Sequence, residues 1–269
     1  MNDVQALCLD IDGVLLNGKR RLPGSRRLLE FLRKRALAFI LLTNDGNHSP
    51  WEKARRLNQA GLTIAPSHIV SCGHAIGPLV RSRGLAGKRF FAMGDTGRPC
   101  YAKNAGLRIT RDLRRLHRCD GVIIGEEHYD WEPVINAVVN YFIDHPQAPL
   151  IVPNPDEFYP AVKLKIHIAA GGVGRFIQQV LKTFGIDITP VYLGKPFPPI
   201  FHLAHENLER QLGHKISPDK VVMVGDNLGA DVAGGRCMGY RTALLLTGVT
   251  AQSTLKRSKL IPDIVLDAL

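Results

Sequence analysis

Residues 4–14 read Val-Gln-Ala-Leu-Cys-Leu-Asp-Ile-Asp-Gly-Val, an apolar run that ends in two acids and a glycine. The run Val4–Leu9 has the length and composition of a buried strand. Asp10 and Asp12 are two residues apart, so they share one face while the chain stays extended. Gly13 permits a sharp turn directly after them. The stretch therefore predicts a strand that ends in a pair of carboxylates.

Similar apolar runs alternate with amphipathic helices along the rest of the chain. The expected strands include Leu37–Leu42, Ile69–Ser71, Phe90–Met93, Gly121–Ile124, Leu150–Val152, Val191–Leu193, Val221–Val224, Thr242–Leu246 and an edge strand at Ile264–Val265. The expected helices include Ser25–Arg35, Pro50–Ala60, Trp131–Ile143, Gly174–Phe184, Ile200–Leu212 and Ala230–Met238. Ser25 is the expected N-cap of the first helix. This alternation indicates an α/β fold with a doubly wound parallel sheet, covered by helices on both faces.

Polar residues follow several of these strands. Thr43 and Asn44 come after the second strand, Asp226 follows Val221–Val224, and Lys195 follows Val191–Leu193. Ligands of open parallel sheets bind outside the carboxyl ends of the strands, so these residues are candidates for one site.

The residue types at these positions suit phosphoryl transfer. Clustered carboxylates repel unless a cation compensates them, and Mg²⁺ prefers such oxygen ligands. A phosphoryl group also needs a nucleophile, hydrogen-bond donors and positive charge. Taken singly, each motif has a plainer interpretation, such as a loop pair, a structural metal site, a helix cap or a turn. Their order and their placement at strand ends favour a phosphohydrolase.

The set of motifs resembles the haloacid dehalogenase superfamily of phosphohydrolases. Leu9–Val14 is similar to the first motif of that family and Leu41–Asn44 to the second, while Gly194–Pro196 and Gly225–Asp231 are similar to the third and fourth. About thirty residues separate Asp12 from Thr43, and about 150 separate Thr43 from Lys195. The long insert resembles subclass IIA, the NagD-type and nitrophenylphosphatase-like group.

The resemblance implies a Rossmann-type catalytic core, residues 1–76 and 194–269. It also implies an inserted α/β cap domain of the C2 type, residues 77–193. Asp10 would be the nucleophile that forms an aspartyl-phosphate, and Asp12 the general acid and base. Thr43, Asn44 and Lys195 would bind the phosphoryl group.

The metal site implied by the resemblance holds Mg²⁺ through Asp10, Asp12 and Asp226, with Asn227 and Asp231 behind them. In the cap, Asp156 and Arg175 are candidate substrate contacts, although Arg175 could equally be a surface helix residue.

Three positions depart from the family pattern. Arg175 follows Gly172-Val173-Gly174, where the family usually has a small residue. Asp45 adds an acid beside the second motif, where it could point away, bind water or discourage highly charged substrates. Ala230 stands where a threonine often precedes the last aspartate, which could weaken support of the metal site.

The bulk composition limits the class of protein. The net charge is +11, with basic clusters that include Arg55-Arg56. These clusters lack interleaved aromatics and a nucleic-acid motif, so we favour solvated helix faces and attraction of anionic substrates over nucleic-acid binding. There is no long apolar segment, no signal peptide pattern and no paired cysteine motif among the five cysteines, so a cytoplasmic protein is expected.

The sequence thus predicts a Mg²⁺-dependent phosphatase that hydrolyses a small phosphorylated metabolite, such as a nucleotide, sugar or polyol phosphate. The alternatives are a phosphotransferase or mutase, and a non-catalytic binding protein derived from the family. A homodimer is possible.

Overall fold

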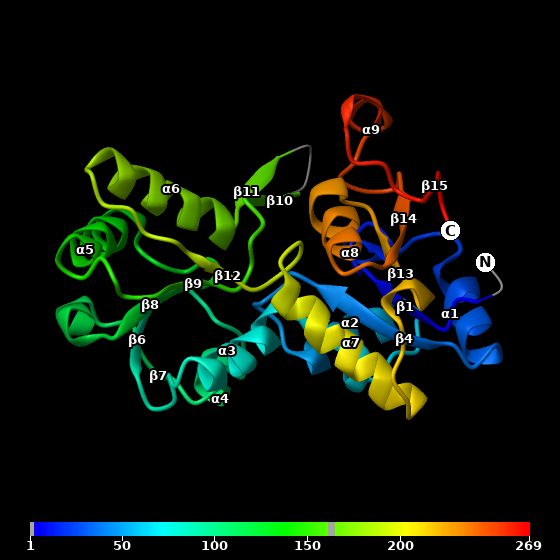
Figure 1. Ribbon diagram of the computed structural model, residues 1–269, viewed down its shortest axis with the longest axis horizontal. Coiled ribbons are helices and arrows are strands. Elements are labelled where there is room, and N and C mark those ends of the chain that lie inside the picture. The colour runs from blue at the N-terminus through cyan, green and yellow to red at the C-terminus, as the bar shows by residue number, and fades with distance from the viewer. Residues whose placement is uncertain (1–2, 161–164) are drawn as a thin grey trace. The chain divides into compact units, whose positions relative to one another are not determined.

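The computed structural model describes residues 3–160 and 165–269 (Figure 1). Contacts divide the chain into two compact units. Unit 1 runs up to Thr43 and includes Pro50–Ser71 and Lys195–Leu269, and unit 2 consists of Asn44–Ser49 and Cys72–Gly194. The two units are built on separate parallel sheets.

The sheet of unit 1 has six strands in the order β15-β14-β13-β1-β4-β5, and every pairing in it is parallel. Its strands are β1 (Ala6–Leu9), β4 (Ala38–Thr43), β5 (Ile69–Ser71), β13 (Val221–Gly225), β14 (Arg241–Leu245) and β15 (Ile264–Leu266). A small antiparallel hairpin, β2 (Leu16–Asn17) and β3 (Arg20–Arg21), follows β1. The central position of β1 places its carboxyl end between those of β4 and β13.

The helices of unit 1 lie on both faces of this sheet. They are α1 (Ser25–Lys34), α2 (Pro50–Gln59), α7 (Pro198–Leu212), α8 (Ala233–Cys237) and α9 (Gln252–Arg257). Leu29 of α1 and Leu57 of α2 share one buried cluster with Phe39 and Val222 of the sheet. Gly235 of α8 lies against Met223, whose side chain points to the opposite face because strand residues alternate. The doubly wound arrangement expected from the sequence is therefore confirmed.

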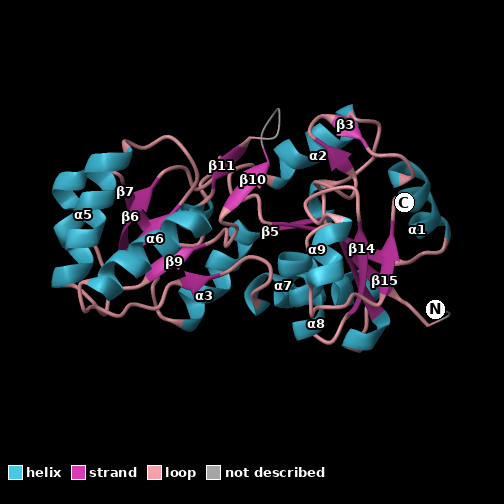
Figure 2. Cartoon of the chain, turned by 90° about the horizontal axis from the view of Figure 1, so that it is seen from above, coloured by secondary structure: helices cyan, strands magenta, loops and turns pink. Residues whose placement is uncertain are grey.

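Unit 2 has a five-stranded parallel sheet in the order β12-β9-β8-β6-β7. Its strands are β6 (Arg89–Met93), β7 (Arg108–Thr110), β8 (Gly121–Ile124), β9 (Leu150–Val152) and β12 (Val191–Tyr192), with a hairpin of β10 (Phe158–Pro160) and β11 (Ile166–Ile168). Its helices are α3 (Ile76–Ser82), α4 (Tyr101–Asn104), α5 (Trp131–Asp144) and α6 (Ala170–Thr183). Phe142 of α5 and Ile177 of α6 pack on Val122 and Val152 in one buried core, and Figure 2 shows both helices beside this sheet.

Helix α6 begins earlier than the sequence indicates. The sequence predicts a helix from Gly174, but Gly171 and Gly172 also lie within it. A Cβ at Gly171 would collide with the carbonyl oxygen of Pro155. Glycine at position 171 therefore permits the close approach of two backbone segments.

None of the helices in the described part of the chain is long and apolar enough to cross a membrane.

The prediction that Ser25 is an N-cap is wrong. Gly24 holds the N-cap position, in the left-handed conformation, and Ser25 is the first helical residue. The buried Ser25 hydroxyl reaches back to the loop before the helix, where it lies 2.8 Å from the Leu22 carbonyl oxygen and 3.0 Å from that of Leu15. It ties α1 to the loop that follows β1.

We therefore expect Ser25→Ala to lower the free energy of unfolding by about 1–3 kcal/mol, because buried carbonyls lose their donor. Chemical denaturation measures this change. Ser82→Ala is a matched control, since Ser82 makes the same i−3 contact to Leu79 at an exposed site and should stay within about 0.5 kcal/mol of the wild type. Equal effects of the two substitutions would contradict the role given to Ser25.

Candidate active site

Three candidate residues lie at the carboxyl edge of the unit 1 sheet. Asp10 directly follows β1, Thr43 is the last residue of β4, and Asp226 directly follows β13. The backbone N–H of Asp10 donates to the carbonyl oxygen of Val224 at 2.9 Å, which extends the pairing of β1 with β13 by one residue. Parallel pairing therefore brings Asp10 and Asp226 to neighbouring strand ends.

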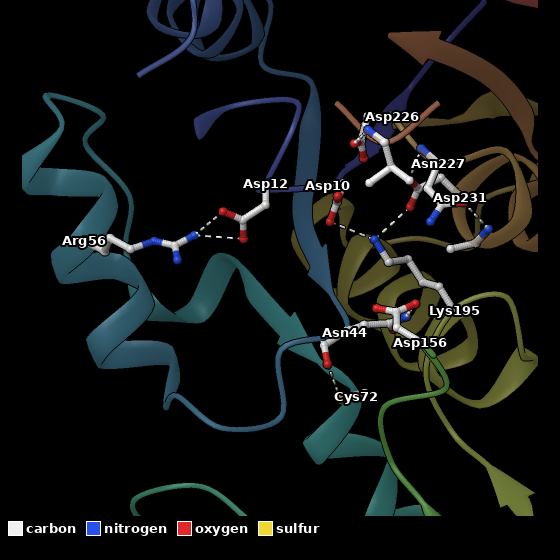
Figure 3. A network of polar contacts seen from close by, with 12 residues as sticks. Asp10, Asp12, Asn44, Arg56, Cys72, Asp156, Lys195, Asp226, Asn227 and Asp231 are labelled. Atoms are coloured by element: carbon white, nitrogen blue, oxygen red, sulfur yellow. Dashed lines mark hydrogen bonds and ion pairs between the residues drawn. The ribbon is translucent and has the colours of Figure 1, made fainter. Parts of the chain in front are cut away.

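Lys195 joins two acids of this edge. Its Nζ lies 2.7 Å from Oδ1 of Asp10 and 2.7 Å from Oδ1 of Asp231 (Figure 3). Lys195 and Asp231 are almost completely buried. The contact brings together residues that are 185 and 36 positions apart in the chain.

Burial controls the protonation of this cluster. Burial opposes the charge on Lys195, but the carboxylates of Asp10 and Asp231 outweigh it and raise the pKa of Lys195. Burial and the neighbouring acids raise the pKa of Asp10, against the effect of Lys195. Burial, followed by the charge of Asp231, raises the pKa of Asp226 to about 6. Asp10 and Asp226 resist ionisation because they are buried close to other acids. Lys195 stays charged because it pairs with two of those acids.

The cluster fits a divalent cation. Oxygen atoms of Asp10, Asp226 and Asp231 lie within 4.8 Å of one another. The Lys195 ammonium contacts two of these three acids, Asp10 and Asp231, so the acids of the cluster outnumber this cation. An all-oxygen donor set with this charge suits Mg²⁺. The residues present therefore fit the metal that the family resemblance implies.

Backbone groups of neighbouring loops surround Asp226 closely. Its Oδ2 accepts the backbone N–H of Val249 at 2.6 Å, and its carbonyl oxygen accepts that of Thr250 at 3.0 Å. Gly13 has a φ of +84°, and a Cβ at this position would collide with the Asp226 carboxylate. Gly13 thus lets the turn after Asp12 pass directly against the neighbouring acid.

Asn227 and Asp231, which the sequence analysis places together behind the metal, have different structural roles. The Asn227 side chain caps the following turn by accepting the backbone N–H groups of Gly229 at 2.9 Å and Ala230 at 3.2 Å. Asp231 points into the acidic cluster and also accepts the Asn227 N–H at 3.1 Å. Asp231 lies with the acids, and Asn227 shapes the turn that places it. Ala230 contributes a backbone donor to that turn.

Asp12 is turned toward a partner that the sequence did not reveal. Both of its carboxylate oxygens accept from Nη2 of Arg56 in α2, at 2.8 and 2.9 Å (Figure 3). The Asp12 side chain remains 53% exposed. In the sequence, Arg55-Arg56 looks like part of a solvated helix face, so the helical pattern alone gave no signal for this contact.

Asn44 belongs to unit 2, although it is bonded directly to Thr43. Both residues are buried. The Asn44 Nδ2 donates to Oδ1 of Asp156 at 3.0 Å, and its backbone oxygen accepts from Sγ of Cys72 at 3.0 Å. Asn44 and Asp156, both expected near the substrate, are therefore in contact with each other.

The other two residues singled out in unit 2 have local partners. Arg175 is exposed, and its guanidinium lies 3.0 Å from the Glu157 carboxylate and 5.3 Å from the centre of the Tyr192 ring. The Asp45 carboxylate accepts the backbone N–H groups of Asn47 at 2.9 Å and His48 at 3.0 Å. Asp45 thus stabilises the turn after the second motif.

Comparison with known proteins assigns the family. A family model described as haloacid dehalogenase-like hydrolase matches residues 7–108, and one described as HAD-hydrolase-like matches residues 192–269. The chain is 30% identical over 253 residues to the ribonucleotide monophosphatase NagD of Escherichia coli (strain K12), an alignment that covers 92% of this chain and 90% of NagD. The chain belongs to the haloacid dehalogenase-like hydrolase family. It is also 27% identical over 261 residues to a dihydroxyacetone phosphatase from Corynebacterium glutamicum (strain R), covering 97% of this chain and 87% of that protein.

Structural comparison agrees with this assignment. A solved structure of NagD from E. coli K-12 superposes with a TM-score of 0.81 at 26% identity, covering 98% of this chain and 96% of NagD. The subclass IIA resemblance and the fold class predicted from the sequence are confirmed. The chain is a haloacid dehalogenase-type phosphatase, as the motifs predicted.

The close approach of Gly13 to Asp226 generates a prediction about both stability and activity. Gly13→Ala should abolish most phosphatase activity and cost more than about 2 kcal/mol of unfolding free energy, because the new Cβ displaces the carboxylate of Asp226. Gly18→Ala is the matched control, since Gly18 also has a positive φ but a Cβ there would meet nothing within 4 Å.

The control should cost about 1 kcal/mol of unfolding free energy and retain activity. Denaturation and phosphate release measure the two effects. Retained activity in folded Gly13→Ala would contradict the steric role of this glycine.

Proposed function

We propose that the chain is a Mg²⁺-dependent phosphatase that hydrolyses small phosphomonoesters through an aspartyl-phosphate on Asp10. The observation that carries the proposal is the buried edge where Lys195 contacts Asp10 and Asp231 beside Asp226. Such an edge offers a nucleophile, a fixed positive charge and a place for a divalent cation.

In this mechanism an oxygen of Asp10 attacks phosphorus while the bond to the leaving oxygen breaks. Asp12 gives a proton to the leaving oxygen. Asp12 then removes a proton from a water molecule, which attacks the phosphorus of the aspartyl-phosphate and releases phosphate and free Asp10. Thr43 and Lys195 bind the oxygens of the transferring phosphoryl group, and Asn44 supports them.

Asp10, Asp226 and the backbone carbonyl of Asp12 would hold Mg²⁺, with Asp231 and Asn227 behind them. When bound, the ion would supply positive charge that offsets the charge of the phosphoryl group. The closeness of the three acids Asp10, Asp226 and Asp231 supports this assignment.

We assign the substrate to small phosphorylated metabolites such as nucleotide, sugar or polyol phosphates. The names of the relatives support this class, since one is a ribonucleotide monophosphatase and the other a dihydroxyacetone phosphatase. We further propose that unit 2 is the C2-type cap, close to the expected residues 77–193, and that the enzyme works in the cytoplasm.

A phosphate-release screen over many phosphomonoesters tests the proposal. We expect release from at least one small substrate, dependent on Mg²⁺ and lowered about a thousandfold or more by Asp10→Asn, because the nucleophile is lost. Asp219→Asn, at an exposed acid that contacts Ser217, should leave release unchanged. Activity without metal, or undiminished activity of Asp10→Asn, would refute the mechanism.

The Arg56 contact predicts a dependence on the leaving group. Arg56 holds both oxygens of Asp12, so Arg56→Gln should impair proton donation by loosening the orientation of that acid. We expect kcat/KM to fall about tenfold for an alkyl phosphate and much less for 4-nitrophenyl phosphate, whose leaving group needs little protonation. Arg55→Gln, at an exposed neighbour of equal charge, should change neither value. An equal loss for both substrates would show that Arg56 does not act through Asp12.

A further inference from the structure

Glu126 is a buried acid outside the acidic cluster of unit 1. It follows β8 in unit 2 and is 8% exposed. Its Oε1 accepts from Nδ2 of Asn154 at 2.8 Å, and the backbone N–H of Ala170 at the start of α6 also donates to the carboxyl group. A carboxylate in such a place is costly unless donors meet it. Here the donors are amides rather than a cation.

Burial raises the pKa of Glu126 to about 7, against the two hydrogen bonds and with the help of the charges of Asp156 and Asp45. Tyr129 and Tyr159 also lie within the reach of its charge. Asp95 pairs with Glu126 through the backbone, while its own carboxylate contacts Arg111 at 2.7 Å and His128 at 3.0 Å. The Glu126 carboxyl group therefore changes charge near neutral pH.

Consecutive hydrogen bonds lead from Glu126 to Asn44. Asn154 donates to Glu126 through Nδ2 and accepts the backbone N–H of Asp156 through Oδ1 at 2.9 Å. Asp156 in turn accepts from Nδ2 of Asn44 at 3.0 Å. All four residues belong to unit 2. The series links a buried acid to the residue that follows Thr43.

The charge of Glu126 fixes the direction of this series. An ionised carboxylate only accepts, so it requires the NH₂ end of Asn154 and leaves the amide oxygen for Asp156. A protonated carboxyl group could instead donate to that oxygen. The amide would then turn, and its NH₂ would face the Asp156 N–H, which is also a donor. Protonation of Glu126 would thus break the series at Asp156.

Asn44 is next to both points at which the chain passes between the two units, after Thr43 and before Lys195. It is peptide-bonded to Thr43. Its side-chain oxygen also lies so close to Gly194, the residue before Lys195, that a Cβ there would collide with it. The Asn44 residue is thus bonded to Thr43, and its side chain meets the residue that precedes Lys195.

We propose that Glu126 is a positioning residue that, through Asn154 and Asp156, orients Asn44 and with it the backbone that carries Thr43 and Lys195. The inference rests on the proposed function. Glu126 does not touch the substrate, and it acts when ionised. Phosphate release should therefore lose activity as the pH falls through about 7.

The ionised form of Glu126 should also lower the free energy of unfolding at high pH. Because its folded pKa of about 7 exceeds the ordinary value of 4.5, the folded state binds more protons between these pH values. The contribution of Glu126 to the unfolding free energy therefore decreases as the pH rises from about 4.5 to about 7. A residue retained only for stability would not behave in this way.

Glu126→Gln tests the proposal in the full-length enzyme, with the substrate found in the phosphate-release screen. We expect kcat at pH 8 to fall about tenfold, the part of the pH profile with an apparent pKa near 7 to disappear, and Tm at pH 8 to stay equal or rise. In an Asn44→Ala background the same substitution should have little further effect, because both changes break one series. Glu127→Gln, at the adjacent exposed acid, is the matched control and should match the wild type.

Other results would overturn the inference. It fails if folded Glu126→Gln keeps the wild-type kcat and pH profile, or if its full effect persists in the Asn44→Ala background. If Glu126→Gln does not fold, Asp156→Ala replaces it, and retention of the pH limb near 7 in that variant overturns the inference. Wild-type protein without Asp10-dependent activity would overturn the proposed function and this inference together. If the wild type is active and Glu126→Gln has the same kcat and pH profile, the inference alone is overturned.

Discussion

The Lys195 ammonium lies between Asp10 and Asp231, 2.7 Å from an oxygen of each, in a place that water hardly reaches. Removing these charges from water is costly, and their mutual attraction offsets that cost only when the geometry is good. The central position of β1 supplies this geometry, because it sets Asp10 directly beside the end of β13, after which Asp226 and Asp231 follow. Lys195 is also where the chain re-enters unit 1. The contact therefore fixes both the acidic cluster and the return of the chain to the core.

The acidic cluster was predictable from the sequence because its determinants are local. An apolar run followed by an acid marks the carboxyl end of a buried strand, and parallel pairing brings such ends together. Asp10 and Asp226 both meet this condition, and Thr43 marks the end of the strand beside β1. The place of Asp231 was less apparent, because it depends on the turn that Asn227 caps. A list of motif residues does not say which of them lies in the acidic cluster and which one shapes the loop.

The contacts that the sequence did not reveal join segments without a shared periodicity. Arg56 reaches Asp12 across 44 residues from a helix whose pattern indicates only a solvated face. Glu126 meets Asn154 across 28 residues, and in the sequence it is simply one of two acids after a strand. Ser25 was misassigned for a related reason, since a serine before an apolar stripe is typical of an N-cap, whereas its hydroxyl instead contacts a loop ten residues upstream. Such pairings depend on tertiary packing, which propensity and spacing do not encode.

The negative charge of the acidic cluster in unit 1 and that of Glu126 in unit 2 are offset by different kinds of partner. The two sites therefore differ in the chemistry that they can support. Asp10 and Asp231 contact the Lys195 ammonium and lie close to a third acid, Asp226, an arrangement in which a bound cation would offset the repulsion between the acids. The Glu126 carboxyl group is met by neutral amides, so protonation is the simplest way for it to lose its charge. The first arrangement suits the binding of a divalent cation. The second suits a residue whose hydrogen-bonding direction changes with pH, and Asn154 and Asp156 transmit that direction toward Asn44.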